Sequence, residues 1–182
     1  MSKKFQKISE EVIHQNPHWI YKKDIFECDG KKEEYFYGEF ADGVIVVPIL
    51  DNGQVVLIRQ YRYLRDRYSI EFTMGGLHVD ETPAQAAVRE LKEETGLQSS
   101  NFSKIAEFEP YIGSAKDTSH VFLANEISDT GVPIPDETED IEVIFRRPDE
   151  IDRMIHNGEI WHGQTIAAWM LARDLVMRPK HQ

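Results

Sequence analysis

Gly75–Leu97, GGLHVDETPAQAAVRELKEETGL, is the stretch from which the rest of the chain is interpreted. It begins as a glycine turn and continues with the periodicity of a helix. Thr82 is a favourable N-cap, Pro83 suits the first helical position, and Gln85 can complete a capping box. Gly96 supplies the left-handed residue that commonly ends a helix. The stretch therefore predicts a glycine turn followed by a capped helix.

The predicted helix carries acidic side chains where packing alone would disfavour them. Glu93 and Glu94 occupy the last turn, where the helix dipole disfavours anions by roughly 0.3–1 kcal/mol each. Glu90 and Glu94 also repel each other at i, i+4 by roughly 0.2–0.5 kcal/mol. A divalent cation reverses both effects, and clustered carboxylates suit hard Mg²⁺ or Mn²⁺. The pattern favours a metal site over the alternative, a solvated amphipathic face. The predicted apolar stripe beside it consists of Ala84, Ala87, Val88, Leu91 and Thr95.

The same stretch matches the pattern G-x5-E-x7-R-E-U-x-E-E-x-G-U, where U is aliphatic, without a gap. The matching residues are Gly75, Glu81, Arg89, Glu90, Leu91, Glu93, Glu94, Gly96 and Leu97. This pattern is the signature of the Nudix hydrolases, which the chain therefore resembles. The resemblance implies a mixed α/β (α+β) fold, an α/β/α sandwich with a mixed sheet. It also implies Mg²⁺-dependent hydrolysis, with Mn²⁺ as the alternative ion, of a nucleoside diphosphate linked to another moiety.

The resemblance also assigns roles to residues of the motif. It implies metal contacts from the carboxylates of Glu90, Glu93 and Glu94 and from the carbonyl of Met74. Arg89 and Glu93 count among the catalytic residues. Glu81 and Arg89 brace the turn and orient the metal carboxylates, a kind of support that is costly to lose.

Composition excludes several classes of partner. The chain has 182 residues and a formal net charge of −11, which argues against a nucleic-acid polymer or an anionic membrane. Cys28 is the only cysteine, so no intrachain disulfide and no cysteine metal cluster can form. No apolar run has the length of a signal peptide core or a membrane span. These features predict a cytoplasmic enzyme.

The chain is expected to form two parts, an N-terminal β subdomain at residues 1–40 and a Nudix domain at residues 41–182. Residues 1–16 are polar and are expected to be poorly fixed. Two strands between Trp19 and Phe40 flank an Asp-Gly turn and predict a β-hairpin. Two isolated strands cannot bury so many aromatic side chains, so they must pack on their own domain or on a partner chain. The resemblance suggests that they cross to a second subunit, so a homodimer with swapped N-terminal strands is expected.

Strands and helices are expected to alternate after the hairpin. The predicted strands are Val44–Leu50 and Gln54–Tyr61, as a second hairpin, and Tyr68–Thr73, Phe102–Tyr111, His120–Ala124 and Asp140–Phe145. A helix begins at Pro148 and a last one runs from Gln164 to Met177. The last helix is expected to bury Ile166, Trp169, Met170 and Val176.

Further site residues follow from similarity to the branch of the family that acts on ADP-ribose and nucleotide sugars. There a Q-x-R contacts phosphates, which maps onto Arg62, and bidentate pairing favours Arg over Lys. The substrate contacts implied besides Arg62 are Trp19, Tyr35, Tyr37, Gly76, Ser114 and Lys116. The segment Glu137-Thr-Glu139-Asp140-Ile141 resembles one in which the first Glu is the general base and the second a metal ligand. Without the resemblance it is a solvated acidic loop.

The expected activity is hydrolysis of a nucleoside diphosphate sugar to a nucleoside monophosphate and a sugar phosphate. Thr73-Met74 stands where the ADP-ribose branch usually has Pro-Ala, and the loop from Ile112 to Lys116 lacks the prolines usual in that branch. Because of the missing prolines, nucleotide sugars other than ADP-ribose remain open. One alternative is hydrolysis of a dinucleoside polyphosphate or another nucleotide derivative. Another is a sensor that binds a nucleotide sugar without turning it over, against which the complete signature argues.

Overall fold

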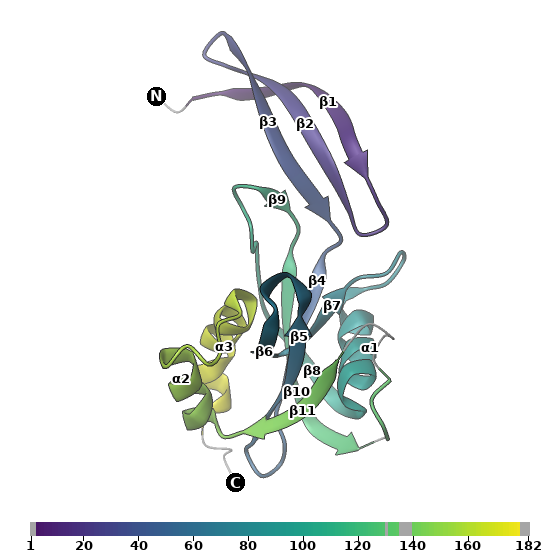
Figure 1. The fold of residues 1–182 in the computed structure, drawn as a ribbon, viewed down its shortest axis with the longest axis vertical. Helices are drawn as coiled ribbons and strands as arrows, with labels where there is room; N and C mark the ends of the chain where they lie inside the picture. The colour runs from purple at the N-terminus through teal and green to yellow at the C-terminus, as the bar shows by residue number, and fades with distance from the viewer. Residues whose placement is uncertain (1–2, 130, 135–139, 179–182) are drawn as a thin grey trace. The chain divides into compact units, whose positions relative to one another are not determined.

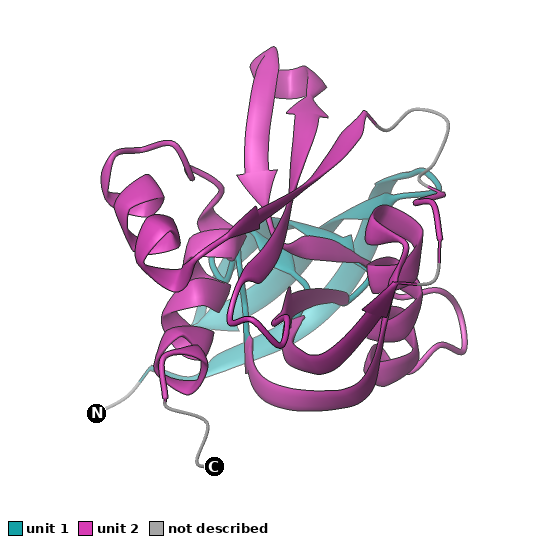
Figure 2. Cartoon of the chain, turned by 90° about the horizontal axis from the view of Figure 1, so that it is seen from below, with its two compact units in different colours: residues 1–42, 108–118 teal, residues 43–107, 119–182 magenta. Residues whose placement is uncertain are grey.

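The computed structural model describes residues 3–129, 131–134 and 140–178. The chain divides into two compact units, which Figure 2 shows in different colours. The N-terminal unit comprises residues 1–42 and 108–118. The core unit comprises residues 43–107 and 119–182.

The N-terminal unit is a four-stranded sheet in the order β1-β2-β3-β9. The strands are β1 (Phe5–Gln15), β2 (Trp19–Cys28), β3 (Lys31–Phe40) and β9 (Ala115–Lys116). Strand β2 is antiparallel to both β1 and β3, and β9 runs parallel to β3. Asp29 and Gly30 have φ of 53° and 78°, as a tight hairpin turn requires, so the predicted β2–β3 hairpin is confirmed.

The prediction that residues 1–16 are poorly fixed is wrong for Phe5–Gln15, because this stretch forms β1 and extends the hairpin by a third strand. Charged residues of β1 pair with opposite charges on β2. Lys7 Nζ lies 2.9 Å from Asp24 Oδ2, and Glu11 Oε2 lies 2.6 Å from Lys23 Nζ. Cross-strand ion pairs of this kind stabilise a sheet. A polar composition is therefore compatible with an ordered edge strand.

The described part of the core unit contains two sheets. One has the order β7-β4-β10-β8 and the other β11-β5-β6. The strands of the first are β7 (Thr73–Gly76), β4 (Gly43–Pro48), β10 (Ser119–Asp129) and β8 (Leu97–Phe108). Those of the second are β11 (Ile141–Arg146), β5 (Val55–Arg62) and β6 (Arg67–Glu71), and the 3-10 turn η1 (Tyr63–Arg65) joins β5 to β6. Because β4 is parallel to β10 and antiparallel to β7, the first sheet is mixed.

Two predicted strand arrangements in the core unit are wrong. Strands β4 and β5 do not form a hairpin sheet, since only the isolated bridge Ile49–Val55 joins them before they enter different sheets. The predicted strand Tyr68–Thr73 is divided between β6 and β7. Residues 44–47 and 55–58 are buried without interruption, so each strand is covered on both faces. Such continuous apolar runs suit a central strand more than a hairpin with one wet face.

Among the described residues, three helices flank these sheets: α1 (Pro83–Thr95), α2 (Pro148–His156) and α3 (Gly163–Val176). Figure 1 shows α1 on one side of the strands and α2 and α3 on the other. Helix α1 packs against β4 and β7, and α3 packs against β4. The predicted α/β/α sandwich with a mixed sheet is confirmed.

Helix α3 buries a narrower face than predicted. Trp169 is fully buried, with its ring centroid 6.3 Å from that of Phe72, but Met170 is 66% exposed. Ile166 and Val176 are half-buried. The buried positions 165, 168, 169 and 172 follow the helical spacing i, i+3, i+4, i+7, which leaves position 170 on another face.

Candidate active site

Helix α1 has the caps that its sequence predicts. The Thr82 hydroxyl accepts a hydrogen bond from the Gln85 backbone N–H (3.3 Å), and Gln85 Oε1 accepts one from the Thr82 backbone N–H (2.9 Å). Gly96 ends the helix with φ of 70°. Local chemistry therefore defines both ends of the helix on which the acidic residues stand.

The buried face of α1 differs from the predicted stripe. Ala84 and Val88 are exposed, whereas Glu90 and Glu94 are only 9% and 4% exposed. The buried set is Ala86, Ala87, Glu90, Leu91, Glu94 and Thr95. Carboxylates are rarely buried unless they are paired or bind a metal. The buried face of α1 is therefore rotated from the predicted one, and Glu90 and Glu94 lie against the sheet.

Both buried carboxylates lie against strand β7. Glu94 Oε2 accepts a hydrogen bond from the Met74 backbone N–H (3.2 Å). The Glu90 carboxylate lies beside Gly75, where a Cβ atom would be 1.9 Å from Glu90 Oε1. Gly75 does not have a positive φ, so the glycine is required for space and not for backbone conformation.

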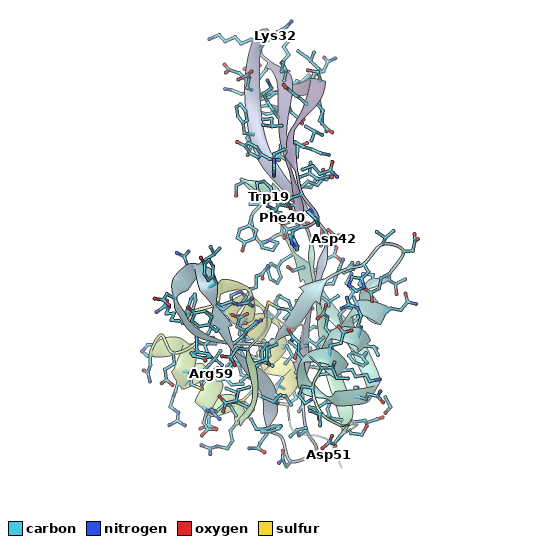
Figure 3. All side chains as sticks on the ribbon, turned by 45° about the vertical axis from the view of Figure 1, so that its right-hand side comes forward. Trp19, Lys32, Phe40, Asp42, Asp51 and Arg59 are labelled. Carbon is cyan, nitrogen blue, oxygen red and sulfur yellow. The ribbon has the colours of Figure 1, made fainter. Side chains whose placement is uncertain are left out.

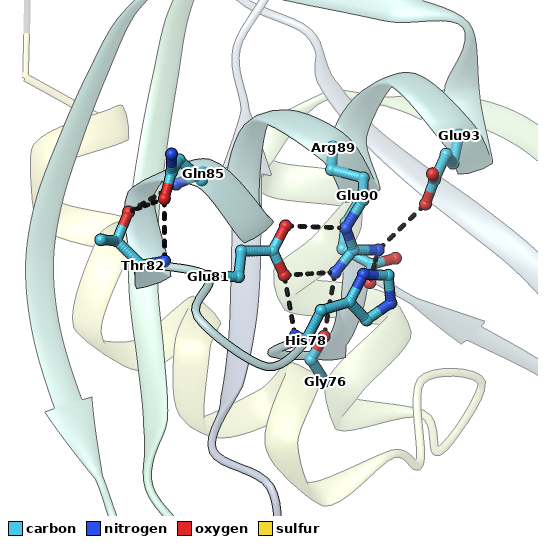
Figure 4. A network of polar contacts seen from close by, with 8 residues as sticks. All are labelled: Gly76, His78, Glu81, Thr82, Gln85, Arg89, Glu90 and Glu93. Atoms are coloured by element: carbon cyan, nitrogen blue, oxygen red, sulfur yellow. Dashed lines mark hydrogen bonds and ion pairs between the residues drawn. The ribbon is translucent and has the colours of Figure 1, made fainter.

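Arg89 joins the helix to the glycine turn, as Figure 4 shows. Its Nε and Nη2 donate to the two oxygens of Glu81, both at 2.9 Å. Nη2 also donates to the carbonyl of Gly76 (2.9 Å). Nη1 donates to Glu90 (2.6 Å) and Glu93 (3.0 Å). One guanidinium thus contacts three carboxylates of the motif and the turn.

Glu81 is held from two sides. Besides the pair with Arg89, its Oε2 accepts a hydrogen bond from the His78 backbone N–H (2.9 Å). The hydrogen bonds from Arg89, opposed by desolvation and assisted by the His78 N–H, lower the pKa of Glu81 to about 2. Glu81 therefore remains ionised at neutral pH and keeps Arg89 in place.

The donors on α1 and β7 fit a hard divalent cation in chemistry. Glu90 and Glu94 are buried carboxylates on one face, Glu93 follows on the same turn, and the space beside Gly75 admits the Glu90 carboxylate. Oxygen donors of this kind suit Mg²⁺ or Mn²⁺. Within the described ranges, no three His, Cys, Asp or Glu side chains are already gathered as a metal site. The predicted ligand Glu139 lies outside those ranges.

Arg62, at the end of β5, is paired with a buried carboxylate. Its Nε donates to Glu71 Oε1 (2.7 Å) and its Nη2 donates to Glu71 Oε2. His162 Nδ1 lies 3.7 Å from Glu71 Oε2 and accepts a hydrogen bond from the Thr165 backbone N–H (3.4 Å). Sequence analysis missed Glu71 and His162. A lone acidic residue in the otherwise apolar run Ile70–Phe72 was the available signal for Glu71.

We expect His162 to make stability depend on pH below neutrality. Burial lowers the pKa of His162, against the opposing effect of Glu71 and with a smaller lowering effect of Arg62. A group whose pKa is lower in the folded state takes up protons on unfolding, so stability decreases as pH falls below about 6.5. His162→Asn retains an N-cap for α3. From about pH 7.5 to about pH 5.5, the thermal midpoint of the His162→Asn variant should fall less than that of the wild type. The control His18→Asn, at an exposed histidine, should behave as the wild type does. An equal fall for His162→Asn and the wild type would contradict the assignment.

Four predicted substrate residues meet in one cavity of the N-terminal unit. They are Tyr35, Tyr37, Ser114 and Lys116. The cavity has a volume of about 490 Å³, and its other lining residues are Lys7, Asp24, Glu109, Ile112 and Ala115. The Tyr35 hydroxyl donates to the Gly113 carbonyl (2.7 Å), and the Tyr37 hydroxyl donates to Asp24 Oδ1 (3.3 Å). Sequence analysis missed Lys7 because residues 1–16 were expected to be poorly fixed.

Trp19 is not among the residues that line this cavity. Its ring stacks on Phe40, with centroids 6.0 Å apart and an interplanar angle of 20°; Figure 3 labels both residues. Its edge meets Tyr21 at a centroid distance of 6.1 Å. Gly76 belongs to the core unit, where its carbonyl contacts Arg89.

The predicted general base Glu137 and the predicted ligand Glu139 lie outside the described residues. The next residue along the chain, Asp140, is held by strands β5 and β6. Its carbonyl accepts a hydrogen bond from the Tyr61 backbone N–H (3.3 Å), and its Oδ2 accepts one from the Tyr68 hydroxyl (2.5 Å). Strand β11 follows, with Ile141 in register with Gln60.

The fold and the motif geometry define a Nudix-type domain, and comparison with known families agrees. The model of the NUDIX domain family matches residues 39–169. The chain therefore belongs to the Nudix family. A solved structure described as "Crystal structure of ADP compounds hydrolase" has the same fold, with a TM-score of 0.83 and 20% identity. It covers 95% of this chain and 94% of its own.

Curated relatives are similar over most of their length. The chain is 29% identical over 150 residues to the ADP-ribose pyrophosphatase of Bacillus subtilis (strain 168), covering 82% of this chain and 81% of the relative. It is 33% identical over 155 residues to the ADP-sugar pyrophosphatase of Mus musculus, covering 78% and 69%. It is 32% identical over 185 residues to the GDP-mannose pyrophosphatase of Yersinia enterocolitica, covering 91% and 93%.

No helix in the described part of the chain is long and apolar enough to cross a membrane.

Proposed function

We propose that this protein is a divalent-metal-dependent pyrophosphatase that hydrolyses the diphosphate bond of a nucleoside diphosphate sugar. The products are a nucleoside monophosphate and a sugar phosphate. The observation that carries the proposal is the burial of Glu90 and Glu94, one helical turn apart, against Met74 and Gly75, since two buried like charges at this spacing are stabilised by a bound cation. The names of the relatives, which are pyrophosphatases of ADP-ribose, ADP-sugars and GDP-mannose, support this substrate class.

In this proposal, carboxylates of α1 hold the metal. Glu90, Glu93 and Glu94 would provide side-chain oxygens, Met74 its carbonyl, and Glu139 a further carboxylate. When bound, Mg²⁺ supplies positive charge that offsets the charge of the diphosphate and makes a water molecule more acidic. We prefer Mg²⁺ over Mn²⁺ as the physiological ion. Arg89 keeps Glu90, Glu93 and Glu81 at fixed positions relative to the turn.

The chemical step needs a base and a group that binds phosphate. Glu137 is proposed to take a proton from the attacking water. The water oxygen then bonds to phosphorus as the bond between phosphorus and the bridging oxygen breaks. Arg62 is proposed to bind a phosphate, because a guanidinium matches phosphate oxygens bidentately. Arg89 contributes by orienting the carboxylates that it contacts.

Residues of the N-terminal unit are proposed to bind the nucleoside. The cavity lined by Tyr35, Tyr37, Ser114 and Lys116 combines aromatic rings with a hydroxyl and a cation. Such a lining suits a base and a sugar hydroxyl or phosphate. Trp19 is proposed as a stacking residue, and Gly76 as a backbone contact of the substrate.

A substrate panel tests the proposal directly. Phosphate release in the presence of added phosphatase and Mg²⁺ would be measured with nucleotide sugars, dinucleoside polyphosphates and nucleoside triphosphates. We expect the highest kcat/KM with a nucleotide sugar. Preference for a dinucleoside polyphosphate would reassign the substrate. Tight binding of nucleotide sugars without turnover would indicate a sensor.

We expect Gly75→Ala to reduce kcat by roughly tenfold or more while the fold is retained. The new methyl group would occupy the place of the Glu90 carboxylate, which is the flexible end of a side chain and can turn away. Stability should therefore change little, while a proposed metal ligand is displaced. Kinetics at saturating Mg²⁺ and circular dichroism provide the measurement. Gly163→Ala is the control, because nothing lies within 4 Å of a Cβ added there. Normal kcat for Gly75→Ala would exclude Glu90 as a ligand.

We also propose that residues 1–40 mediate a homodimer with swapped N-terminal strands. The sheet of the N-terminal unit exposes several large apolar side chains to solvent. They are Phe5, Ile8, Val12, Ile13, Tyr35, Phe36 and Phe40. Burying such surface is favourable at roughly 25 cal/mol per Å². A second copy of the same sheet is the occupant that a two-fold dimer provides.

Light scattering of the full-length protein at micromolar concentration should therefore give the mass of a dimer. Phe36→Asp should raise the dimer dissociation constant by roughly tenfold or more, since a buried aromatic side chain contributes about 1.5–3 kcal/mol. Phe145→Asp is the matched control, because Phe145 is 42% exposed and Phe36 is 46% exposed. An active monomer at micromolar concentration would refute the swap.

Location in the cytoplasm, suggested by the single free Cys28, is a further prediction.

A further inference from the structure

The carboxylate of Glu71 is the most deeply buried charge described in the core unit. Its side chain is 0% exposed, on strand β6 beside Phe72. A carboxylate at such a position is strongly destabilising unless a partner compensates it. Arg62 provides that partner through a two-pronged contact from Nε and Nη2. The pair therefore has a fixed anion on the inside and a cation that reaches outward.

The Arg62 guanidinium lies at the boundary between core and solvent. Its side chain is 36% exposed, although its partner is fully buried. A bidentate pair fixes the plane of a guanidinium as well as its position. The neighbouring pair between Arg59 and Glu142 lacks this property, since it consists of one 3.3 Å contact between two exposed side chains. Arg59 also stacks on the ring of Tyr68 (3.6 Å to the centroid), but of these two arginines on β5 Arg62 is the one held by a bidentate contact to a fully buried carboxylate.

Helix α3 fixes the surroundings of Glu71. The Thr165 hydroxyl, which is fully buried, accepts a hydrogen bond from the Phe72 backbone N–H (3.2 Å) and lies 3.0 Å from His162 Nδ1. His162 in turn lies 3.7 Å from Glu71 Oε2. The residue after Glu71 and the first turn of α3 are thus held together. Movement of the Glu71 carboxylate would disturb this arrangement.

We propose that Glu71 is a positioning residue that holds the Arg62 guanidinium in the orientation in which it binds a phosphate group of the substrate. This inference rests on the proposed function, in which Arg62 contacts phosphate. Glu71 itself does not contact the substrate. Its effect on binding is transmitted entirely through Arg62, and this distinguishes it from a residue that acts independently or only stabilises the fold.

A double-mutant cycle in the full-length protein tests this. Glu71→Gln, Arg62→Ala and the double variant would be compared in kcat and KM with ADP-ribose and Mg²⁺, and in ADP affinity by calorimetry. We expect Glu71→Gln to reduce kcat/KM and ADP affinity by about tenfold, with the same division between kcat and KM as Arg62→Ala. In the Arg62→Ala background, Glu71→Gln should have no further effect. Arg62→Lys should not restore affinity, because an ammonium group lacks the planar fork.

Glu142→Gln is the matched control, since it removes the carboxylate partner of Arg59 and should leave kinetics and ADP affinity unchanged. Additive effects of the two substitutions, or wild-type ADP affinity in a folded Glu71→Gln protein, would overturn the inference. If Glu71→Gln does not fold, Glu71→Asp retains the charge but is too short for the bidentate contact, and the same loss is expected. If the wild type hydrolyses no nucleotide sugar, the proposed function fails, while the ADP-binding cycle still supports or refutes the role of Glu71.

Discussion

Glu94→Gln is expected to lower kcat by at least about a hundredfold while leaving the fold intact. Glu94 is buried on α1 and accepts a hydrogen bond from the Met74 N–H. Replacing its charge by an amide would remove a proposed metal ligand without changing the shape of the side chain. The metal-free thermal midpoint should rise slightly, because Glu90 and Glu94 repel each other one turn apart.

The measurement combines kinetics over a range of Mg²⁺ concentrations with thermal unfolding in the presence of a chelator. Glu159→Gln, a substitution of an exposed carboxylate after α2, is the control and should leave both unchanged. Near-normal turnover of Glu94→Gln at saturating Mg²⁺ would exclude the proposed metal site on α1. Loss of folding without metal would instead show that the buried carboxylate is needed for structure.

Glu137→Gln is expected to lower kcat by about a hundredfold with little change in KM. A general base acts mainly in the transition state, so its removal affects the chemical step more than substrate binding. Glu139→Gln should instead raise the Mg²⁺ concentration that gives half-maximal activity, because a metal ligand is lost. The two residues precede Asp140, which Tyr61 and Tyr68 hold at the start of β11.

Glu137→Gln is expected to change kcat, and Glu139→Gln the Mg²⁺ requirement, so each variant is a control for the other. Steady-state kinetics would be measured at fixed Mg²⁺ with varied substrate, and at fixed substrate with varied Mg²⁺. Exchange of the two patterns would mean that Glu139 is the base and Glu137 the ligand. Normal kinetics for both variants would place the base elsewhere and make this segment a solvated acidic loop.

Helix α1 shows what could be predicted from the sequence. Its N-cap, its capping box and its final glycine all lie within a turn of the residues that they affect, and each was found where expected. The hairpin turn at Asp29-Gly30 was predicted for the same reason. In contrast, the periodicity of α1 placed Ala84 and Val88 on the buried face, although both are exposed. The periodicity of one helix does not show which of its side chains the neighbouring sheet covers.

Strand pairing was predicted less well, because it depends on residues distant in the chain. The polar segment of β1 pairs with β2 along the backbone and carries ion pairs across the two strands, which composition alone does not reveal. Strands β4 and β5 follow one another through a turn but belong to different sheets. Sequence adjacency favours a hairpin, yet burial on both faces requires each strand to have its own neighbours.

The sequence by itself determined the family, the capped helix α1 and the acidic residues on it, because these follow from spacing and local hydrogen bonding. Only the tertiary structure decided that Glu90 and Glu94 face the sheet and lie against Met74 and Gly75. It alone paired Arg62 with the buried Glu71, which the sequence had not indicated as a partner. The physical reason is that the burial of a charge depends on the elements packed around it, and these come from distant parts of the chain.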